Sequence, residues 1–300
     1  MTSPAGAWPH KRVTIMGLGS FGGGVGLARY LAMQGARVTV TDLQTADKLS
    51  NSLKALAGLP ICFVLGEHRD ADFTDADVVF VNPAVPLTSR YLDLARRHGV
   101  ALDSEINLFV RQCRGRVIGI TGSVGKSTTT SLLGSILRLH DARTLVGGNL
   151  GGSLLPHLDE ITPDTLVALE LSSFQLEHLA WQCYSPPVAM VLNLTPNHLD
   201  RHGTMAAYQE AKEGILAYQT PADTAILNWD DAIVRQMARH TPGRRLFYSM
   251  EEGVDEGVYR QGDAVIYASG GSHTVLCHAA DVVLQGEHNL GNAAAAGGTP

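Results

Sequence analysis

The stretch Thr121-Gly-Ser-Val-Gly-Lys-Ser-Thr128 decides the fold of the second half of the chain. It follows an apolar run at 117–121 that is typical of a buried strand, and residues 126–139 are typical of a helix. Glycines let the backbone curl so that successive N–H groups face an anion, and the helix that begins here adds the positive end of its dipole. The sequence therefore predicts a phosphate-binding loop between a strand and a helix.

Within this loop, the residue types suit a nucleoside triphosphate and magnesium. Lys126 can reach a terminal phosphate, and the Ser127 hydroxyl can bind Mg²⁺. Ile120 stands where a complete P-loop motif has its first glycine, so the match is partial. The alternative, a tight turn with an exposed lysine, does not explain why strand, turn and helix occur together. We expect the nucleotide to contact the loop residues Gly122, Ser123, Val124, Gly125, Lys126, Ser127 and Thr128.

A second glycine-rich turn, Gly17-Leu-Gly-Ser-Phe-Gly22, follows the apolar run at 13–16. It matches G-x-G-x-x-G, and Asp42 ends the next apolar run, where an acid that binds a ribose belongs. Because this motif is weak alone, three alternatives stay open: an NAD site, a turn that only packs a helix on a strand, and a site for a nucleotide diphosphate that is a substrate. The residues expected at such a site are Gly17, Leu18, Gly19, Ser20 and Asp42.

Apolar runs of strand length alternate with amphipathic segments of helix length as far as Gly243. Such alternation indicates parallel sheets covered by helices. Past Gly243 short strands and turns follow, and the last residues begin like a helix that then stops, as a truncated end would. The expected strands are 13–16, 37–41, 78–81, 117–121, 165–169, 188–192 and 224–227, then 246–249, 264–267, 274–277 and 281–284.

Length and composition agree with two globular domains. The chain has 300 residues, of which 45% are hydrophobic and 17% charged, so a sizeable core is available. Each glycine-rich turn opens a domain of its own. The predicted fold class is therefore α/β, with a Rossmann-like domain over 1–105 and a central P-loop-type ATPase domain with a parallel sheet over 106–300.

Charge, cysteine spacing and hydropathy narrow the partners and the compartment. The net charge is −6 without a long basic run, which argues against a nucleic-acid or anionic-membrane partner. The four cysteines form no CxxC pair, so neither a zinc site nor a disulfide framework is indicated. No apolar stretch reaches the roughly 18 residues of a membrane span, and the N-terminus lacks a signal-peptide core. We expect a cytosolic monomer.

Five stretches, in order, resemble the motifs of the Mur ligases and together cover nearly the whole chain. They are the loop at 121–128, Gly147-Gly-Asn-Leu-Gly151, Glu170-Leu-Ser-Ser-Phe-Gln-Leu176, Asn193-Leu-Thr-Pro-Asn-His-Leu-Asp-Arg-His202 with Tyr208-Gln-Glu-Ala-Lys212, and His288-Asn-Leu-Gly-Asn292. Within the family, the stretch at 170–176 looks most like the member that adds D-glutamate. So do Gly17-Leu-Gly19, Asn82-Pro-Ala-Val-Pro86 and Ser104-Glu-Ile-Asn-Leu-Phe109. The member that adds L-alanine is the nearest rival.

The resemblance implies an ATP-dependent amide ligase of peptidoglycan precursor synthesis, with ATP and Mg²⁺ as cofactors. Its substrates would be UDP-N-acetylmuramoyl-L-alanine and D-glutamate. The substrate carboxylate would attack the γ-phosphate and become an acyl phosphate, from which the incoming amine would displace phosphate. The turn at 17–22, with Asp42, would then hold the UDP portion of the substrate.

The resemblance also assigns catalytic and metal-binding roles. Lys126 would neutralise the phosphates, and Ser127 or Thr128 would bind a first Mg²⁺ together with Glu170. His198 would bind a second Mg²⁺, and a carbamylated Lys212 would act as a carboxylate-like metal ligand. Considered without the resemblance, these three are a buried paired acid, a loop histidine and a solvent-facing helix lysine.

The remaining family positions are asparagines. Asn149 would contact the sugar-peptide or phosphate portion, and Asn292, with Asn289, would border the adenine; otherwise they serve loops and helix caps. His202, four residues after His198, receives only a structural interpretation. Three functions remain: a ligase, here for D-glutamate or another Mur substrate such as L-alanine; a truncated, non-catalytic nucleotide-binding module; or an NAD-dependent oxidoreductase.

Three departures from the family bear on that choice. Val124 stands where the family usually has asparagine, and Asn197 stands where an acid is frequent. The third, amino-acid-binding domain that follows H-N-x-x-N in the family is not in this sequence. The missing domain favours the module, whereas Glu170, His198 and Lys212 favour a catalytic parent. The oxidoreductase leaves the loop at Gly122 unexplained.

Overall fold

A computed structural model of the chain describes residues 8–19, 22–140, 143–282 and 286–299. The chain forms two compact units. The first comprises Met1–Arg114 and Gly151–Ile161, and the second comprises Gly115–Leu150 and Thr162–Pro300. The boundary expected after residue 105 would cut off helix α5 (Glu105–Gln112), but α5 packs on the first unit's α1 and so stays with it.

The first unit is built on a parallel sheet whose described strands run in the order β3-β2-β1-β4-β5. Its strands are β1 (Arg12–Met16), β2 (Arg37–Asp42), β3 (Ile61–Leu65), β4 (Val78–Val81) and β5 (Ala101–Asp103), and its other α-helices are α1 (Gly23–Met33), α2 (Ser50–Ala55), α3 (Asp70–Thr74) and α4 (Arg90–Arg97). The strand order reverses between β1 and β4, and parallel α/β sheets bind ligands outside the carboxyl ends of their strands at such a point. This order is that of a Rossmann-like half, as predicted.

Within the described residues, the second unit has a nine-stranded sheet in the order β14-β13-β12-β11-β10-β9-β6-β8-β7. Its strands are β6 (Arg116–Thr121), β7 (Leu145–Gly148), β8 (Leu166–Glu170), β9 (Val188–Val191), β10 (Thr224–Asn228), β11 (Arg244–Ser249), β12 (Gly257–Gln261), β13 (Ala264–Ser269) and β14 (Ser272–His278). Pairings from β7 through β12 are parallel, and the last two are antiparallel. The α/β class is confirmed.

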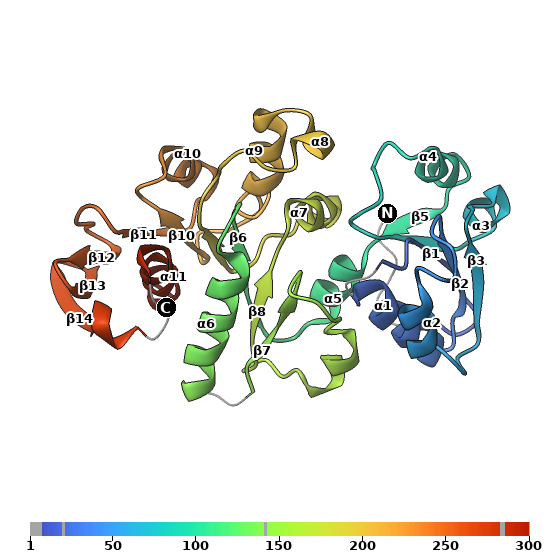
Figure 1. Ribbon diagram of the computed structural model, residues 1–300, viewed down its shortest axis with the longest axis horizontal. Helices are drawn as coiled ribbons and strands as arrows, with labels where there is room; N and C mark the ends of the chain where they lie inside the picture. Colours follow the sequence, from blue (N-terminus) through green and yellow to red (C-terminus); the bar gives the residue numbers. More distant parts are fainter. Residues whose placement is uncertain (1–7, 20–21, 141–142, 283–285, 300) are drawn as a thin grey trace. The chain divides into compact units, whose positions relative to one another are not determined.

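Helices α6 (Lys126–His140) and α11 (Glu287–Gly297) lie side by side on this sheet (Figure 1). Leu133 of α6 and Leu290 of α11 enter one apolar core with Ile118 and Ile120 of β6. Three buried alanines at 294–296 let α11 approach closely. The other α-helices are α7 (Ser173–Leu179), α8 (Leu199–His202), α9 (Met205–Glu213) and α10 (Ala232–Gln236).

Two local expectations differ from the structure. The helix expected over 205–219 ends at Glu213, because Gly214 follows and the chain turns there. The strand expected over 281–284 is not found at Asp281, which closes a 3-10 turn, and residues 283 and 284 lie outside the described residues.

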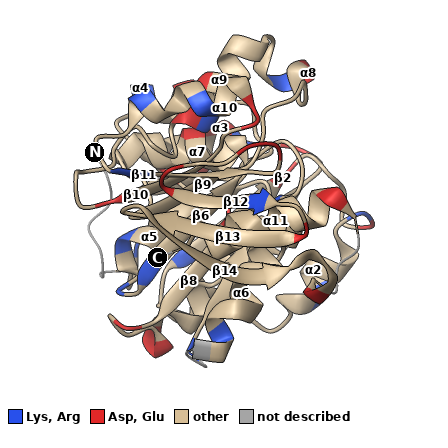
Figure 2. Cartoon of the chain, turned by 90° about the vertical axis from the view of Figure 1, so that its left-hand side faces the viewer, with Lys and Arg blue, Asp and Glu red and all other residues tan. Residues whose placement is uncertain are grey.

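The surface and the helices carry no sign of a basic coat or a membrane span. In the view of Figure 2, Lys and Arg are interspersed with Asp and Glu, without a continuous basic area. None of the helices in the described part of the chain combines the length and the apolar character needed to cross a membrane.

Candidate functional site

The loop at 121–128 joins the end of β6 to the start of α6, as predicted. Gly125 has a φ of 84°, in the left-handed region that favours glycine. A Cβ there would lie 2.8 Å from Oδ1 of Asn292, so α11 brings Asn292 against the loop. Asn292 in turn donates to Asn289 Oδ1 at 3.4 Å. The two α11 asparagines therefore lie beside the candidate phosphate loop, although 160 residues follow it in the chain before they are reached.

Lys126 folds over the loop. Its Nζ donates to the carbonyl oxygens of Gly122 at 2.9 Å and Ser123 at 3.0 Å. Burial lowers the pKa of Lys126, and the nearby Glu170 carboxylate opposes that shift. The ammonium thus lies on the loop that an incoming phosphate would occupy.

Glu170 is the hub of the site. Register explains its position, because Glu170 pairs with Ile120 of β6 on one side and Gly148 of β7 on the other. Only 2% of Glu170 is exposed, and both carboxylate oxygens accept hydrogen bonds: Oε2 from the Ser127 hydroxyl at 2.7 Å, and Oε1 from Asn149 Nδ2 at 2.8 Å. A hydroxyl beside a carboxylate suits Mg²⁺, which prefers oxygen ligands.

Lys212 of α9 is not the solvent-facing lysine that helix position alone indicates. It is 1% exposed, and its Nζ donates to the Gly122 carbonyl oxygen at 2.9 Å and to Thr121 Oγ1 at 3.2 Å. Burial lowers the pKa of Lys212 to about 7; Lys126 also lowers it and Glu170 opposes them. An amine with that pKa is partly deprotonated, and therefore nucleophilic, near neutral pH.

His198 begins α8 with a φ of 52°, which is uncommon for a residue other than glycine. Its ring makes an edge contact with Phe174 at a centroid distance of 5.3 Å and a second with Tyr208 at 6.4 Å. Such a backbone conformation is retained only where surrounding contacts hold it. His198 is thus aimed by its aromatic neighbours.

His202 belongs to the same cluster, which sequence reasoning missed. Its ring stacks on Phe174 at 5.1 Å with an interplanar angle of 9°. Nε2 lies 2.9 Å from the Ser173 hydroxyl, and Nδ1 lies 3.5 Å from Glu177. Burial lowers the pKa of His202, so the ring is predominantly neutral at pH 7. The four-residue spacing from His198 was the available signal.

No group of three His, Cys, Asp or Glu side chains in the described ranges is arranged to hold a metal ion by itself. A divalent cation at Glu170 would therefore take further oxygens from Ser127, nucleotide phosphates and water, which is the usual coordination of Mg²⁺. The donor set at Glu170 fits magnesium.

In the first unit, Gly17 and Gly19 have φ angles of 86° and 67° and lie against the Asn82 side chain. Asp42 stabilises this turn, because Oδ2 accepts from the Leu18 N–H at 2.8 Å and Oδ1 accepts from the Gln44 N–H at 2.8 Å. The carboxylate thus orders the backbone of the turn. Ser20, also expected here, lies outside the described residues.

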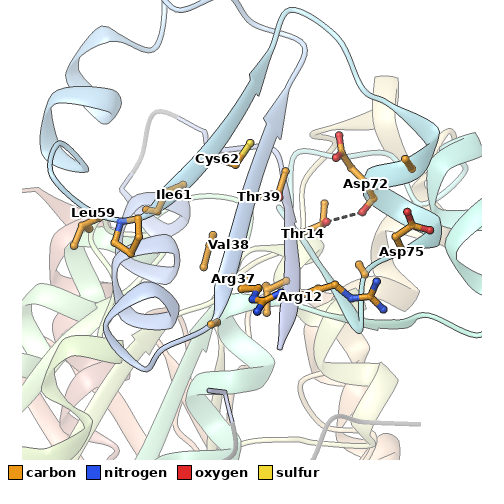
Figure 3. Close-up of a pocket in the computed structure, with 15 residues that line it drawn as sticks. Arg12, Thr14, Arg37, Val38, Thr39, Leu59, Ile61, Cys62, Asp72 and Asp75 are labelled. Carbon is orange, nitrogen blue, oxygen red and sulfur yellow. Dashed lines mark hydrogen bonds between the residues drawn. The ribbon is translucent and has the colours of Figure 1, made fainter. Parts of the chain in front are cut away.

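A hollow of about 600 Å³ also occurs in the first unit, as Figure 3 shows. Arg12 and Arg37 line it where β1 and β2 begin, and Thr14 there donates to the Asp72 carbonyl oxygen at 2.5 Å. It lies at the amino ends of these strands, whereas α/β sheets bind nucleotides at the carboxyl ends. We therefore do not assign the nucleotide to it.

Comparisons with known proteins agree with this geometry. The family model described as the Mur ligase middle domain matches residues 120–299, and the one described as the Mur ligase MurD-like N-terminal domain matches residues 11–103. The chain belongs to the Mur ligase family. This membership leaves the oxidoreductase alternative without support.

Relatives named UDP-N-acetylmuramoylalanine–D-glutamate ligase match along almost the whole chain. The protein of Roseiflexus sp. is 49% identical over 295 residues, which cover 95% of this chain and 63% of that protein. The protein of Symbiobacterium thermophilum is 40% identical over 97% of this chain and 64% of that protein. The chain thus spans somewhat less than two thirds of these relatives.

Solved structures show the same fold at low identity. A UDP-N-acetylmuramate:L-alanyl-gamma-D-glutamyl-meso-diaminopimelate ligase from Neisseria meningitides aligns with a TM-score of 0.65 and 18% identity, over 96% of this chain and 92% of that chain. A murein peptide ligase from Psychrobacter arcticus aligns with a TM-score of 0.59 and 18% identity, over 95% and 64%. The fold is that of Mur ligases.

Proposed function

We propose that this chain provides the ATP and UDP-sugar sites of a ligase that joins D-glutamate to UDP-N-acetylmuramoyl-L-alanine in peptidoglycan precursor synthesis. The observation that supports it most is the arrangement around Gly122, where Lys126 and Lys212 both donate to one carbonyl oxygen. Glu170 lies next to this charge through Ser127. The names of the relatives support D-glutamate over L-alanine as the amino acid added.

The proposed reaction has two steps. The carboxylate of the L-alanyl group attacks the γ-phosphorus of ATP, the bond to the β–γ bridging oxygen breaks, and ADP leaves. The D-glutamate amine then attacks the acyl carbon, phosphate leaves, and the amine loses a proton as the amide forms. Both steps bring anions together, so fixed positive charge and in-line positioning supply most of the catalysis.

The chain's own residues take distinct parts in that scheme. The Lys126 ammonium leaves the loop carbonyl oxygens and neutralises the phosphates. Ser127 and Glu170 hold a Mg²⁺ ion, which when bound supplies further positive charge at the phosphate oxygens. His198 provides a nitrogen ligand for a second ion. In the first unit, the turn at Gly17 and Gly19, which Asp42 orders, holds the UDP portion.

Lys212 is proposed to be carbamylated. Its amine is buried and has a pKa of about 7, so a neutral fraction is present to attack CO₂. The nitrogen–carbon bond forms, one proton is released, and the product carries a carboxylate that can bind a metal ion. Asn149, which donates to Glu170, is proposed to contact the substrate from the adjacent loop. We further propose a cytosolic, monomeric protein.

A second candidate is nucleotide binding without ligation. The observation that favours it is the share of the relatives, 63% and 64%, that the chain spans. The two candidates agree on the ATP loop and differ only in whether product forms.

Incubating the chain with ATP, Mg²⁺, UDP-N-acetylmuramoyl-L-alanine and D-glutamate tests the proposal. We expect phosphate release and the mass of the D-glutamyl product, both abolished by Lys126→Ala. L-alanine with UDP-N-acetylmuramate should give none. Nucleotide binding without product would support the second candidate, and a chain that binds no nucleotide would contradict both.

A further inference from the structure

One side chain joins the phosphate loop to the loop that follows β9. Oδ1 of Asn193 accepts hydrogen bonds from the N–H groups of Ser123 at 3.0 Å and Val124 at 2.9 Å. Nδ2 of Asn193 donates to the Val124 carbonyl oxygen at 3.0 Å. Asn193 therefore uses both polar atoms of its amide on the backbone of two adjacent loop residues.

Ser123 completes the junction from the other side. Its N–H also lies 3.0 Å from the Asn193 carbonyl oxygen. Its hydroxyl accepts from the Thr195 N–H at 2.9 Å and donates to the Thr195 carbonyl oxygen at 3.0 Å. Glycine is needed at 122 for this approach, because a Cβ there would lie 3.0 Å from Cβ of Leu192. The two loops thus form one hydrogen-bonded body, which continues to His198.

This junction changes which amides can hold a phosphate. The expectation from the motif was that the whole loop faces the anion, but the Ser123 and Val124 amides donate to Asn193. The Val124 side chain is 61% exposed and therefore does not hold the loop. Amides that bind phosphate must point at a fixed position, and ordering them in advance avoids an entropic cost on binding.

We propose that Asn193 is a positioning residue that fixes residues 122–124, so that the amides from Gly125 onward, together with Lys126, receive the nucleotide phosphates. The inference rests on the proposed ATP site and adds a residue that touches neither ATP nor metal. It also implies that disturbing Asn193 displaces the phosphate loop and the His198 segment together, because both depend on the same junction.

The variant Asn193→Ala tests this, with Asn228→Ala as its matched control. Asn228 donates to the Leu192 carbonyl oxygen at 2.8 Å and accepts from the Asp230 N–H at 3.0 Å, so its loss also removes two buried or half-buried hydrogen bonds next to the junction. Three quantities are measured for each chain: MgADP affinity by calorimetry, amide exchange over 122–126, and Tm.

For Asn193→Ala we expect MgADP affinity to fall at least about 10-fold, as the loss of two or three ordering hydrogen bonds would produce. Exchange at Ser123 and Val124 should accelerate in the same variant. Asn228→Ala should lower Tm at least as much, yet keep MgADP affinity within about twofold of wild type. That opposite pattern separates positioning from general stability.

Two results would overturn the inference: MgADP affinity unchanged in Asn193→Ala, or equal losses of affinity and Tm in both variants. If the wild-type chain binds no MgADP, the proposed function fails. Amide exchange then decides the junction alone, since unchanged exchange at Ser123 and Val124 in Asn193→Ala contradicts it and faster exchange supports it.

Discussion

Two glycine-rich turns open the two units, and groups of opposite charge complete them. In the first, the Asp42 carboxylate accepts from the Leu18 and Gln44 amides. In the second, the Lys126 ammonium donates to the Gly122 and Ser123 carbonyl oxygens. Glycine sets the backbone in both cases. The residue that closes the turn decides whether it is an ordered neutral cradle or a site of concentrated positive charge.

This difference corresponds to two kinds of task. A nucleotide diphosphate that is only held needs an ordered backbone. A phosphoryl group that is transferred needs positive charge that is fixed before the reaction. In our account the first turn therefore holds the UDP portion of a substrate, and the second turn holds ATP. Each prediction below alters one side of this comparison.

The largest expected effect follows from removing the cation of the second turn. Lys126→Ala should weaken MgATP binding by about 100-fold or more, because a charge-assisted contact with phosphate is lost from a partly buried site. Affinity for UDP-N-acetylmuramoyl-L-alanine should be unchanged. Calorimetry measures both, with Lys54→Ala, at an exposed lysine of α2, as the control. Equal MgATP affinity in wild type and Lys126→Ala would remove the charge from the account.

The next effect concerns the carboxylate of the first turn. Asp42→Asn places an N–H where one of two backbone N–H donors now finds an acceptor, so the turn loses its order. Affinity for the UDP substrate should fall about 10-fold, the cost of an unsatisfied buried donor. The exposed Asp47→Asn serves as the control. A loss of MgATP affinity in place of UDP-substrate affinity would reverse the assignment of the turns.

Lys212 makes the stability of the chain depend on pH. Its pKa is lowered to about 7 in the folded chain from 10.5, so the unfolded chain binds more protons in that interval and stability rises with pH. In CO₂-free buffer, wild type should gain about 1 kcal/mol between pH 7 and pH 8 relative to Lys212→Met. Urea unfolding measures it. A flat difference would mean that the amine is solvated.

Glu105, in the first unit, should show a smaller effect of opposite sign. Desolvation raises its pKa to about 7 from 4.5, and the bond that it accepts from Ser153 Oγ at 2.6 Å opposes the shift. The folded chain then binds more protons between pH 4.5 and 7, so stability falls as pH rises there. Glu105→Gln should remove roughly 0.5 kcal/mol of that fall between pH 5 and pH 6, as urea midpoints would report. An identical slope in both chains would contradict it.

Sequence patterns were sufficient for the parts of the molecule that local order determines. Alternating strands and helices brought the ends of β6 and β8 together, so Ser127 and Glu170 could be predicted as neighbours. The buried position of Lys212 was not evident from its helix, and only the resemblance to Mur ligases indicated it. The boundary after residue 105 failed because nothing local marks α5 as part of the first unit.

Contacts between distant loops were beyond such patterns. Asn193 reaches the phosphate loop across 69 and 70 residues, and its sequence neighbours indicate only a turn after a strand. The part that His202 takes depends on Phe174, which lies on another helix. Asp42 was expected at a ribose, yet its carboxylate hydrogen-bonds the turn itself. In each case the direction of a side chain is set by tertiary packing.

The central claim is that the two turns bind two different ligands. Calorimetric titration of wild type, Lys126→Ala and Asp42→Asn with MgATP and with UDP-N-acetylmuramoyl-L-alanine tests it most directly. The account predicts that Lys126→Ala loses only MgATP binding and Asp42→Asn loses only binding of the UDP substrate. Loss of both ligands in either variant, or loss of the opposite ligand, would contradict the division of tasks between the turns.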